Sequence, residues 1–281
     1  MNKWLRIGLL VFFSATFILS AVMIGSYYWQ SDKAKSQFDE LADLVSATTP
    51  DGKPIARPEP GGQTGSSQSQ NTAAPEPEGE IGTSDSLEAS QPLPQYIEVS
   101  KRNSHMVGWV QIEGTRVNYP VMQTPDSPDY YLKRDFYKNY SGYGCIYARE
   151  QCDVNMPSDN VTIYGHNMKD GSMFADLLKY RSKSFWESHR YVYFDTLTRY
   201  GTYEIFAVFT TTASKGKGFL YNQFVDAVNE DAYDEYVADC KKLSLYDTGI
   251  TPEYGEDLIT LSTCEYTQTN GRFVVVARRV L

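Results

Sequence analysis

The distribution of apolar and polar positions divides the chain into three parts. Residues 7–29 are apolar and carry no charged side chain, whereas residues 48–94 hold no aromatic residue and few large aliphatic ones. From residue 95 onward, short apolar runs alternate with turn-forming residues. Only this last part has the pattern of a folded core, so we expect one globular domain at residues 95–281, preceded by extensions.

The apolar run is long enough to cross a membrane. As an α-helix at ~1.5 Å per residue, residues 7–29 would extend over ~34 Å, more than the ~30 Å hydrocarbon core of a bilayer. Small residues lie inside the run rather than after it, which favours an uncleaved anchor over a cleaved signal peptide. Lys3 and Arg6 on one side and Trp29 on the other predict a cytoplasmic segment 1–6 and a body outside the plasma membrane.

Residues 30–94 are expected to separate the anchor from the domain. Apolar residues recur at spacings of three from Phe38, so a short juxtamembrane helix is predicted within residues 30–47. Residues 48–94 are rich in Pro, Gly, Ser, Gln, Thr and Glu, a composition that cannot bury enough apolar surface to offset chain entropy. We predict a disordered linker there.

The domain reads as mostly β, with a helical lead that starts near Tyr96 and eight short strands bounded by turn signals. Such a series predicts a closed or nearly closed β-barrel. A helix is expected after Asn229, a suitable N-cap, because apolar residues including Cys240 recur there at helical spacing. The expected strands cover residues 108–112, 117–121, 145–148, 161–164, 191–194, 201–211, 258–263 and 273–278.

Two strand ends carry reactive side chains. Cys264 closes the strand at 258–263, and Arg272 opens the next one after a turn, so the two should lie at the same end of a sheet. A cation beside a thiol favours the nucleophilic thiolate. His166 follows the strand at 161–164 and supplies the side chain best suited to proton transfer near neutral pH.

The other cysteines and histidines have simpler interpretations. Cys240 falls on the apolar face of its helix and is expected in the core. A local disulfide between Cys145 and Cys152 is left open, and His105 and His189 lie in polar segments. No Cys-x-x-Cys or His-rich spacing occurs, so neither a metal site nor a cofactor is predicted.

Three motifs together resemble one enzyme family. Residues 260–264, Thr-Leu-Ser-Thr-Cys, match the T-L-x-T-C signature of sortases, and residues 164–174 resemble the histidine region of the class B subfamily. Residues 270–277 are similar to that family's arginine strand. The resemblance covers about residues 96–281 and implies an eight-stranded sortase barrel with an added helix between the sixth and seventh strands.

The same resemblance implies a Gram-positive cell-wall transpeptidase. In that reading Cys264 attacks the sorting signal of a secreted protein to form a thioacyl-enzyme, His166 moves protons, and Arg272 stabilises the oxyanion or the substrate. Ser262 and Glu265 match substrate-contacting positions. The amine acceptor would be a peptidoglycan precursor or, for a pilin-polymerising enzyme, a lysine.

Composition and motif order limit the alternatives. The formal net charge of −9, with no basic block, argues against a nucleic-acid partner. A papain-like hydrolase has its cysteine early, opening a helix, whereas here His166 precedes Cys264. A tethered surface module without catalysis remains open from the sequence.

Overall fold

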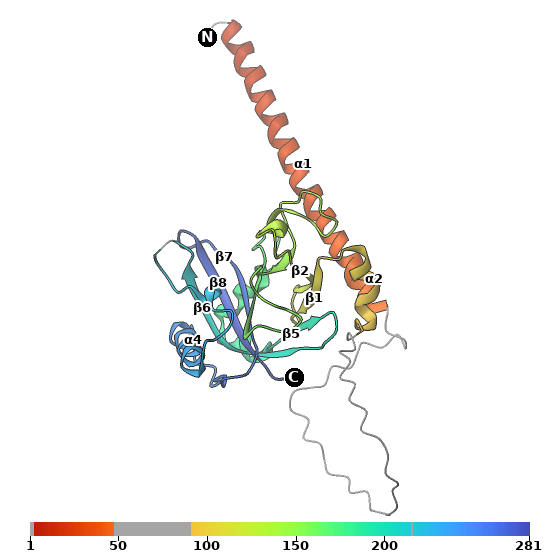
Figure 1. Ribbon diagram of the computed structural model, residues 1–281. Coiled ribbons are helices and arrows are strands. Elements are labelled where there is room, and N and C mark those ends of the chain that lie inside the picture. The colour runs from red at the N-terminus through yellow and green to blue at the C-terminus, as the bar shows by residue number, and fades with distance from the viewer. Residues whose placement is uncertain (1–2, 48–90, 215) are drawn as a thin grey trace, which may run out of the picture.

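A computed structural model describes residues 3–47, 91–214 and 216–281 of the chain (Figure 1). Eight strands form one closed barrel in the order β1-β2-β3-β4-β7-β8-β6-β5, which confirms the predicted fold class. The strands are β1 (Met106–Gln111), β2 (Asn118–Met122), β3 (Ile146–Ala148), β4 (Asn160–Tyr164), β5 (Tyr191–Thr196), β6 (Thr202–Thr212), β7 (Leu258–Glu265) and β8 (Gly271–Arg279).

Helices connect and cover these strands. The α-helices are α1 (Lys3–Ala47), α2 (Pro94–Arg102), α3 (Lys183–Ser188) and α4 (Glu230–Leu243), and 3-10 turns occur at Tyr130–Lys133, Ala175–Arg181 and Tyr221–Gln223. Helix α2 confirms the predicted helical lead, and α4 lies between β6 and β7 as expected. The predicted linker, except for its last few residues, falls outside the described part of the chain.

Strand β7 is central to the barrel because its two neighbours carry the other candidate residues. It pairs with β4 in parallel and with β8 in antiparallel orientation. The parallel pairing places the carboxyl ends of β4 and β7 at the same edge of the barrel. The start of β8 meets that edge too, so three separate sequence motifs converge there.

The middle of strand β8 is continuously apolar instead of alternating between apolar and polar residues, because both faces of the strand are buried. Phe273 and Val275 face the main core inside the barrel, while Val274 and Val276 pack in a second core under α4. A strand buried on both faces has no polar positions to alternate with. Figure 1 shows α4 on the side of the barrel opposite α1.

The N-cap of helix α4 fixes where the helix begins, and its apolar face determines how the helix packs on the barrel. The side chain of Asn229 accepts a hydrogen bond from the Ala232 amide at 2.9 Å, which satisfies one of the free donors of the first turn. Tyr233, Tyr236 and Cys240 are buried against β6 and β8, as expected for Cys240. The helix therefore forms part of the fold's second core.

Helix α1 joins the apolar run to the folded domain without a break. Its N-terminal part has a mean hydropathy of 2.5 over an 18-residue window with no burial, and is long and apolar enough to cross a membrane. Its C-terminal part instead packs on the barrel, where Phe38 and Leu41 are buried and the Phe38 ring meets Tyr119 edge-on at 5.2 Å. The main core thus includes side chains that precede residue 95.

Candidate active site

Cys264 and Arg272 are directly opposite one another in the β7–β8 ladder. Opposite residues in an antiparallel pair lie about 4.5–5.5 Å apart and point to the same face. Both side chains are only partly buried, so each is open to the solvent side of the barrel edge. The adjacency expected from two strands and a turn is present.

Three hydrogen bonds fasten the segment that carries His166 to the end of β7. The Gly165 amide donates to the Ser262 carbonyl at 3.1 Å, and the Thr263 hydroxyl donates to the Gly165 carbonyl at 2.7 Å. The Asn167 side chain donates to the Cys264 carbonyl at 3.0 Å. His166 is therefore held beside the strand that carries Cys264.

The loop after β4 has little freedom to move. A Cβ at Gly165 would stand 2.4 Å from the Ile146 side chain and 2.7 Å from the Phe174 ring, so only glycine fits. Met173 adopts a φ of 57°, which is unusual for a residue other than glycine, and the Phe174 amide donates to the His166 carbonyl at 2.8 Å. The backbone around His166 is thereby fixed.

The same loop is also bonded to α1 through Asp170. Its carboxylate accepts hydrogen bonds at 2.7 Å from the hydroxyls of Ser31, Tyr143 and Ser172. Burial acts to raise the pKa of Asp170, but these hydrogen bonds outweigh burial and lower that pKa to about 2. A negative carboxylate is therefore part of the loop's structure.

The imidazole of His166 is oriented by a backbone group. Its Nε2 lies 2.7 Å from the Leu132 carbonyl oxygen, which can only accept a hydrogen bond, so Nε2 carries a proton and Nδ1 is the nitrogen free to exchange one. Among the described residues no carboxylate forms an ion pair with His166.

The side chain of Arg272 is held by hydrogen bonds to the turn between β7 and β8. Its Nη1 donates to the carbonyls of Gly271 at 3.0 Å and Asn270 at 3.3 Å. No acidic side chain in the described ranges pairs with Arg272, so its positive charge is available to another group at the barrel edge. Asn270 has a φ of 53°, a conformation that asparagine tolerates in tight turns.

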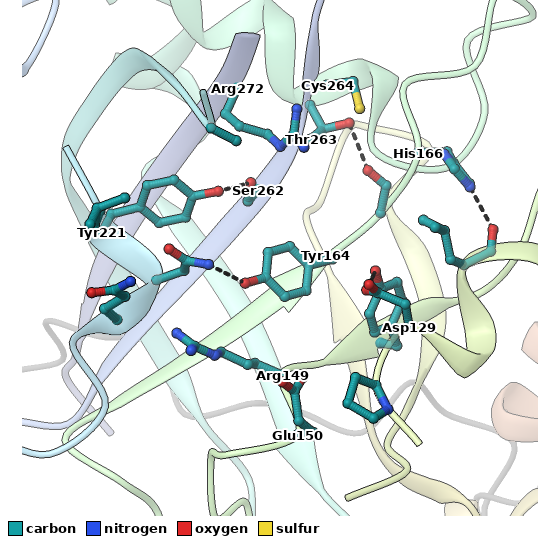
Figure 2. A pocket seen from close by; sticks show the side chains of 18 of the residues that line it. Asp129, Arg149, Glu150, Tyr164, His166, Tyr221, Ser262, Thr263, Cys264 and Arg272 are labelled. Atoms are coloured by element: carbon teal, nitrogen blue, oxygen red, sulfur yellow. Dashed lines mark hydrogen bonds between the residues drawn. The ribbon is translucent and has the colours of Figure 1, made fainter. Parts of the chain in front are cut away.

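The three side chains line one groove with a volume of about 430 Å³. Figure 2 shows Cys264, Arg272 and His166 around one part of the groove, with Arg149 and Glu150 in another part. Its walls come from the ends of β3, β4 and β7, from the chain at and just before the 3-10 turn that contains Leu132, and from the segment between β6 and α4.

The segment between β6 and α4 contributes residues that the sequence pattern did not single out. The buried Tyr221 hydroxyl lies 2.6 Å from the Ser262 hydroxyl, and the Asn222 side chain donates to the Tyr164 hydroxyl at 3.1 Å. Burial raises the pKa of Tyr221. Ser262 thus lines the groove, but it is already engaged by Tyr221.

Glu265 points elsewhere. Its carboxylate is buried, forms an ion pair with Arg181 at 2.8 Å and accepts from the Thr267 hydroxyl at 2.7 Å. It is not among the residues that line the groove. The geometry thus places Ser262 with the candidate catalytic residues and Glu265 outside their groove.

The remaining cysteines and histidines lie outside the groove lining. Cys145, Cys152 and Cys240 are buried free thiols, and burial raises the pKa of each. His105 bonds with the Tyr131 hydroxyl at 3.0 Å, and the His189 ring stacks on Phe185. The contacts of these three cysteines and two histidines thus belong to the fold and not to the groove.

The fold and the groove together define a β-barrel enzyme with a cysteine at a strand end, and comparison with known proteins identifies its family. A family model described as the sortase domain matches residues 110–280, so the chain belongs to the sortase family. Within it the chain is sortase B-like and is a cysteine transpeptidase by homology.

The relatives support that placement at the level of both sequence and structure. Sortase B of Staphylococcus aureus is 32% identical over 189 residues, which cover 66% of this chain and 74% of the relative. Sortase B of Listeria monocytogenes is 37% identical over 186 residues, covering 65% and 73%. The crystal structure of the Staphylococcus aureus enzyme matches with a TM-score of 0.61 at 30% identity, covering 69% of this chain and 90% of that one.

Proposed function

We propose that this transpeptidase cleaves a C-terminal sorting signal of secreted proteins and transfers the protein to an amine of a cell-wall precursor. The observation that carries the proposal is the convergence of Cys264, Arg272 and His166 on one groove. For an acyl transfer through a thioester, the thiol can act as nucleophile, the imidazole can transfer protons and the guanidinium can stabilise the oxyanion.

The reaction proceeds in two halves. In the first, the Cys264 thiolate attacks the carbonyl carbon of the scissile peptide bond, a C–S bond forms, and the C–N bond breaks as His166 gives a proton to the departing amine. In the second, an acceptor amine attacks the thioester and loses a proton to His166. The C–S bond breaks, and the thiolate is restored.

Arg272 supplies the permanent positive charge in both halves. Each half passes through a tetrahedral species whose oxygen carries a negative charge, and a preorganised cation stabilises that oxygen more than the neutral carbonyl. The bonds from Nη1 to two backbone carbonyls hold the guanidinium in place before substrate arrives. Ser262, and less directly Glu265, are proposed to support substrate binding, Glu265 through the β7–β8 turn.

The acceptor and the location are also proposals. A sortase B crystallised with triglycine is a structural neighbour with a TM-score of 0.60 at 29% identity, which supports an unhindered terminal amine as the acceptor. The apolar part of α1 supports a single-pass plasma-membrane anchor with its N-terminus inside and the barrel outside.

Product analysis tests donor and acceptor together. The full chain in detergent is incubated with peptides that contain a Thr-Asn or Thr-Gly bond, in the presence of triglycine or of an acetylated lysine amide. We expect a new peptide bond to triglycine, and none with Cys264→Ala. Ligation to the lysine amine alone would support pilin polymerisation instead, and the absence of any ligated or hydrolysed product would contradict the proposal.

A further inference from the structure

A second arginine lines the groove apart from the candidate catalytic residues. Arg149 directly follows β3, and Figure 2 shows its side chain below Tyr164, in a different part of the groove from Arg272. None of the steps described above uses Arg149, so its presence in the groove requires another explanation.

The backbone of Arg149 is fixed on both sides. Its amide donates to the Thr162 carbonyl at 2.8 Å, which extends the β3–β4 pairing by one residue. Its carbonyl accepts from the Gln123 side chain at 2.8 Å and from the Cys152 amide at 3.2 Å. The side chain therefore starts from a rigid position at the groove wall.

The guanidinium group, by contrast, has few partners. Its Nε donates to the Gln151 side chain at 2.5 Å, while Nη1 is buried and has no hydrogen-bond partner within the described ranges. A buried guanidinium nitrogen without an acceptor is unfavourable. A ligand oxygen in the groove would satisfy it once the guanidinium turns from its buried position toward the groove.

Neither acidic residue of the groove neutralises this charge. Asp129 accepts a hydrogen bond from the Tyr147 hydroxyl at 2.7 Å, and Glu150 makes no ion pair with Arg149 among the described residues. Arg149 does reach the groove electrostatically, since its charge acts to lower the pKa of both Tyr164 and Tyr221. Arg149 thus contributes to the groove wall a positive charge that has no ion-pair partner among the described residues.

We propose that Arg149 is a specificity-determining residue that binds an acidic side chain of the sorting peptide, at a position away from the cleaved bond. The inference rests on the proposed function and adds the chemistry of one peptide position to it. A carboxylate offers two oxygens to the planar guanidinium, whereas a lysine at the same position is repelled. Glu150 lies in the same groove and weakens the preference without removing it.

The test compares peptides that differ at one position by Glu, Gln or Lys, scanned in turn over the residues that flank a Thr-Asn or Thr-Gly bond. Each is assayed with the full-length enzyme and with Arg149→Gln and Arg149→Glu. At one position the wild type should prefer Glu to Lys by about tenfold or more in kcat/KM, as expected for a charge-assisted hydrogen bond. Arg149→Gln should reduce this preference to about threefold or less, and Arg149→Glu should reverse it.

Two further variants test whether the preference for Glu over Lys depends on charge inside the groove. Glu150→Gln should increase the preference for Glu over Lys, because it removes the opposing charge. Lys242→Glu makes the same charge reversal as Arg149→Glu at an exposed position near the end of α4, outside the groove, and should leave the ratio unchanged.

The ratio of kcat/KM for the Glu peptide to kcat/KM for the Lys peptide distinguishes recognition of the peptide side chain from damage to the fold. If both Arg149 variants cleave peptides but keep the wild-type ratio at every position, or lose rate equally on all three peptides, Arg149 is structural and the inference is overturned. If the wild type itself cleaves none of the peptides, the proposed function fails and this inference fails with it.

Discussion

The Arg272 guanidinium lies across the β-ladder from Cys264, and its planar shape is central to its proposed role. We predict that Arg272→Lys lowers kcat/KM almost as much as Arg272→Ala, by about 100-fold or more, because a lysine cannot bond the turn carbonyls and the oxyanion together. Steady-state peptide cleavage measures this. A lysine variant within a few-fold of wild type would show that charge alone suffices.

The contribution of the Asp170 carboxylate to stability depends on pH and can be tested with a single substitution. Its pKa is lowered to about 2 in the folded state, against about 3.9 for an unperturbed Asp, so its stabilisation is complete above about pH 4 and disappears as the pH falls through 2. Asp170→Asn should therefore reduce the free energy of unfolding at pH 7 by about 1–2 kcal/mol, allowing for screening by water.

Urea unfolding at pH 7 and near pH 2 measures this difference. The loss should shrink as the pH approaches 2, because about half of the wild-type carboxylate is protonated at a pH equal to its pKa. Asp126→Asn, which changes an exposed carboxylate, is the matched control and should have little effect at either pH. An equal loss for Asp170→Asn at both pH values would rule out the charged carboxylate as the cause.

At the scale of residues, the neighbours of a side chain were predictable from the sequence only where the pattern of strands and turns fixes its position. Cys264 and Arg272 flank a turn between two strands, so their adjacency follows from the antiparallel register. The Leu132 carbonyl that orients His166 comes from a distant turn without a distinctive sequence, and Tyr221 begins a three-residue 3-10 turn that is too short to give a periodic pattern. Contacts of this kind depend on the closed barrel and have no local signal.

At the scale of elements, the loop between β4 and the following 3-10 turn is the part that should respond most sharply to small changes. Gly165→Ala would place a Cβ 2.4 Å from the Ile146 side chain and 2.7 Å from the Phe174 ring. We expect a stability loss of about 1–3 kcal/mol and a larger loss in kcat than in KM, because His166 is displaced. Unchanged kcat would show that the loop tolerates the shift.

Helix α1 gives a second test at this scale, because one helix has two kinds of surface. Phe38 is buried against Tyr119, and Phe38→Ala should destabilise the folded domain by about 3–5 kcal/mol. Phe17→Ala, the same change on the exposed apolar part, should leave the unfolding of the domain unaffected. Equal effects of both substitutions would contradict the packing of α1 on the barrel.

The number and order of the elements were predictable, whereas the packing of α1 was not. Alternating runs bounded by turns predicted all eight strands, with ends that differ by a few residues because strand pairing decides them. Residues 30–47 were predicted to be helical, but spacing alone does not say whether an apolar face meets a barrel, a membrane or water. The Phe38 contact with Tyr119 is therefore a finding of the structure.

At the scale of the whole molecule, α1 links the apolar segment directly to the candidate active site. The helix donates from Ser31 to Asp170 in the His166 loop and pairs with α2 through Glu40 and Arg102 at 2.7 Å. Both elements that flank residues 48–90 are thus anchored to the barrel. The length of that segment does not set the distance between the apolar helix and the groove.

We therefore predict that replacing residues 50–88 with a short Gly-Ser connection preserves activity. Turnover of peptides by the purified full-length chain, and transfer in cells, should both stay within about twofold of wild type, because loop length has a small effect on loop-closure entropy. A selective loss of transfer in cells would instead assign this segment a role in reaching the acceptor.

The most direct measurement of the central claim is the mass of the enzyme itself during turnover. The full chain is mixed with a cleavable peptide without an added amine, quenched in acid, and digested to locate any adduct. We expect the mass of the acyl fragment on the peptide that contains Cys264, loss of the adduct on adding triglycine, and no adduct with Cys264→Ala. An adduct on Cys145, Cys152 or Cys240, or peptide cleavage that persists in Cys264→Ala, would contradict a thioacyl mechanism at Cys264.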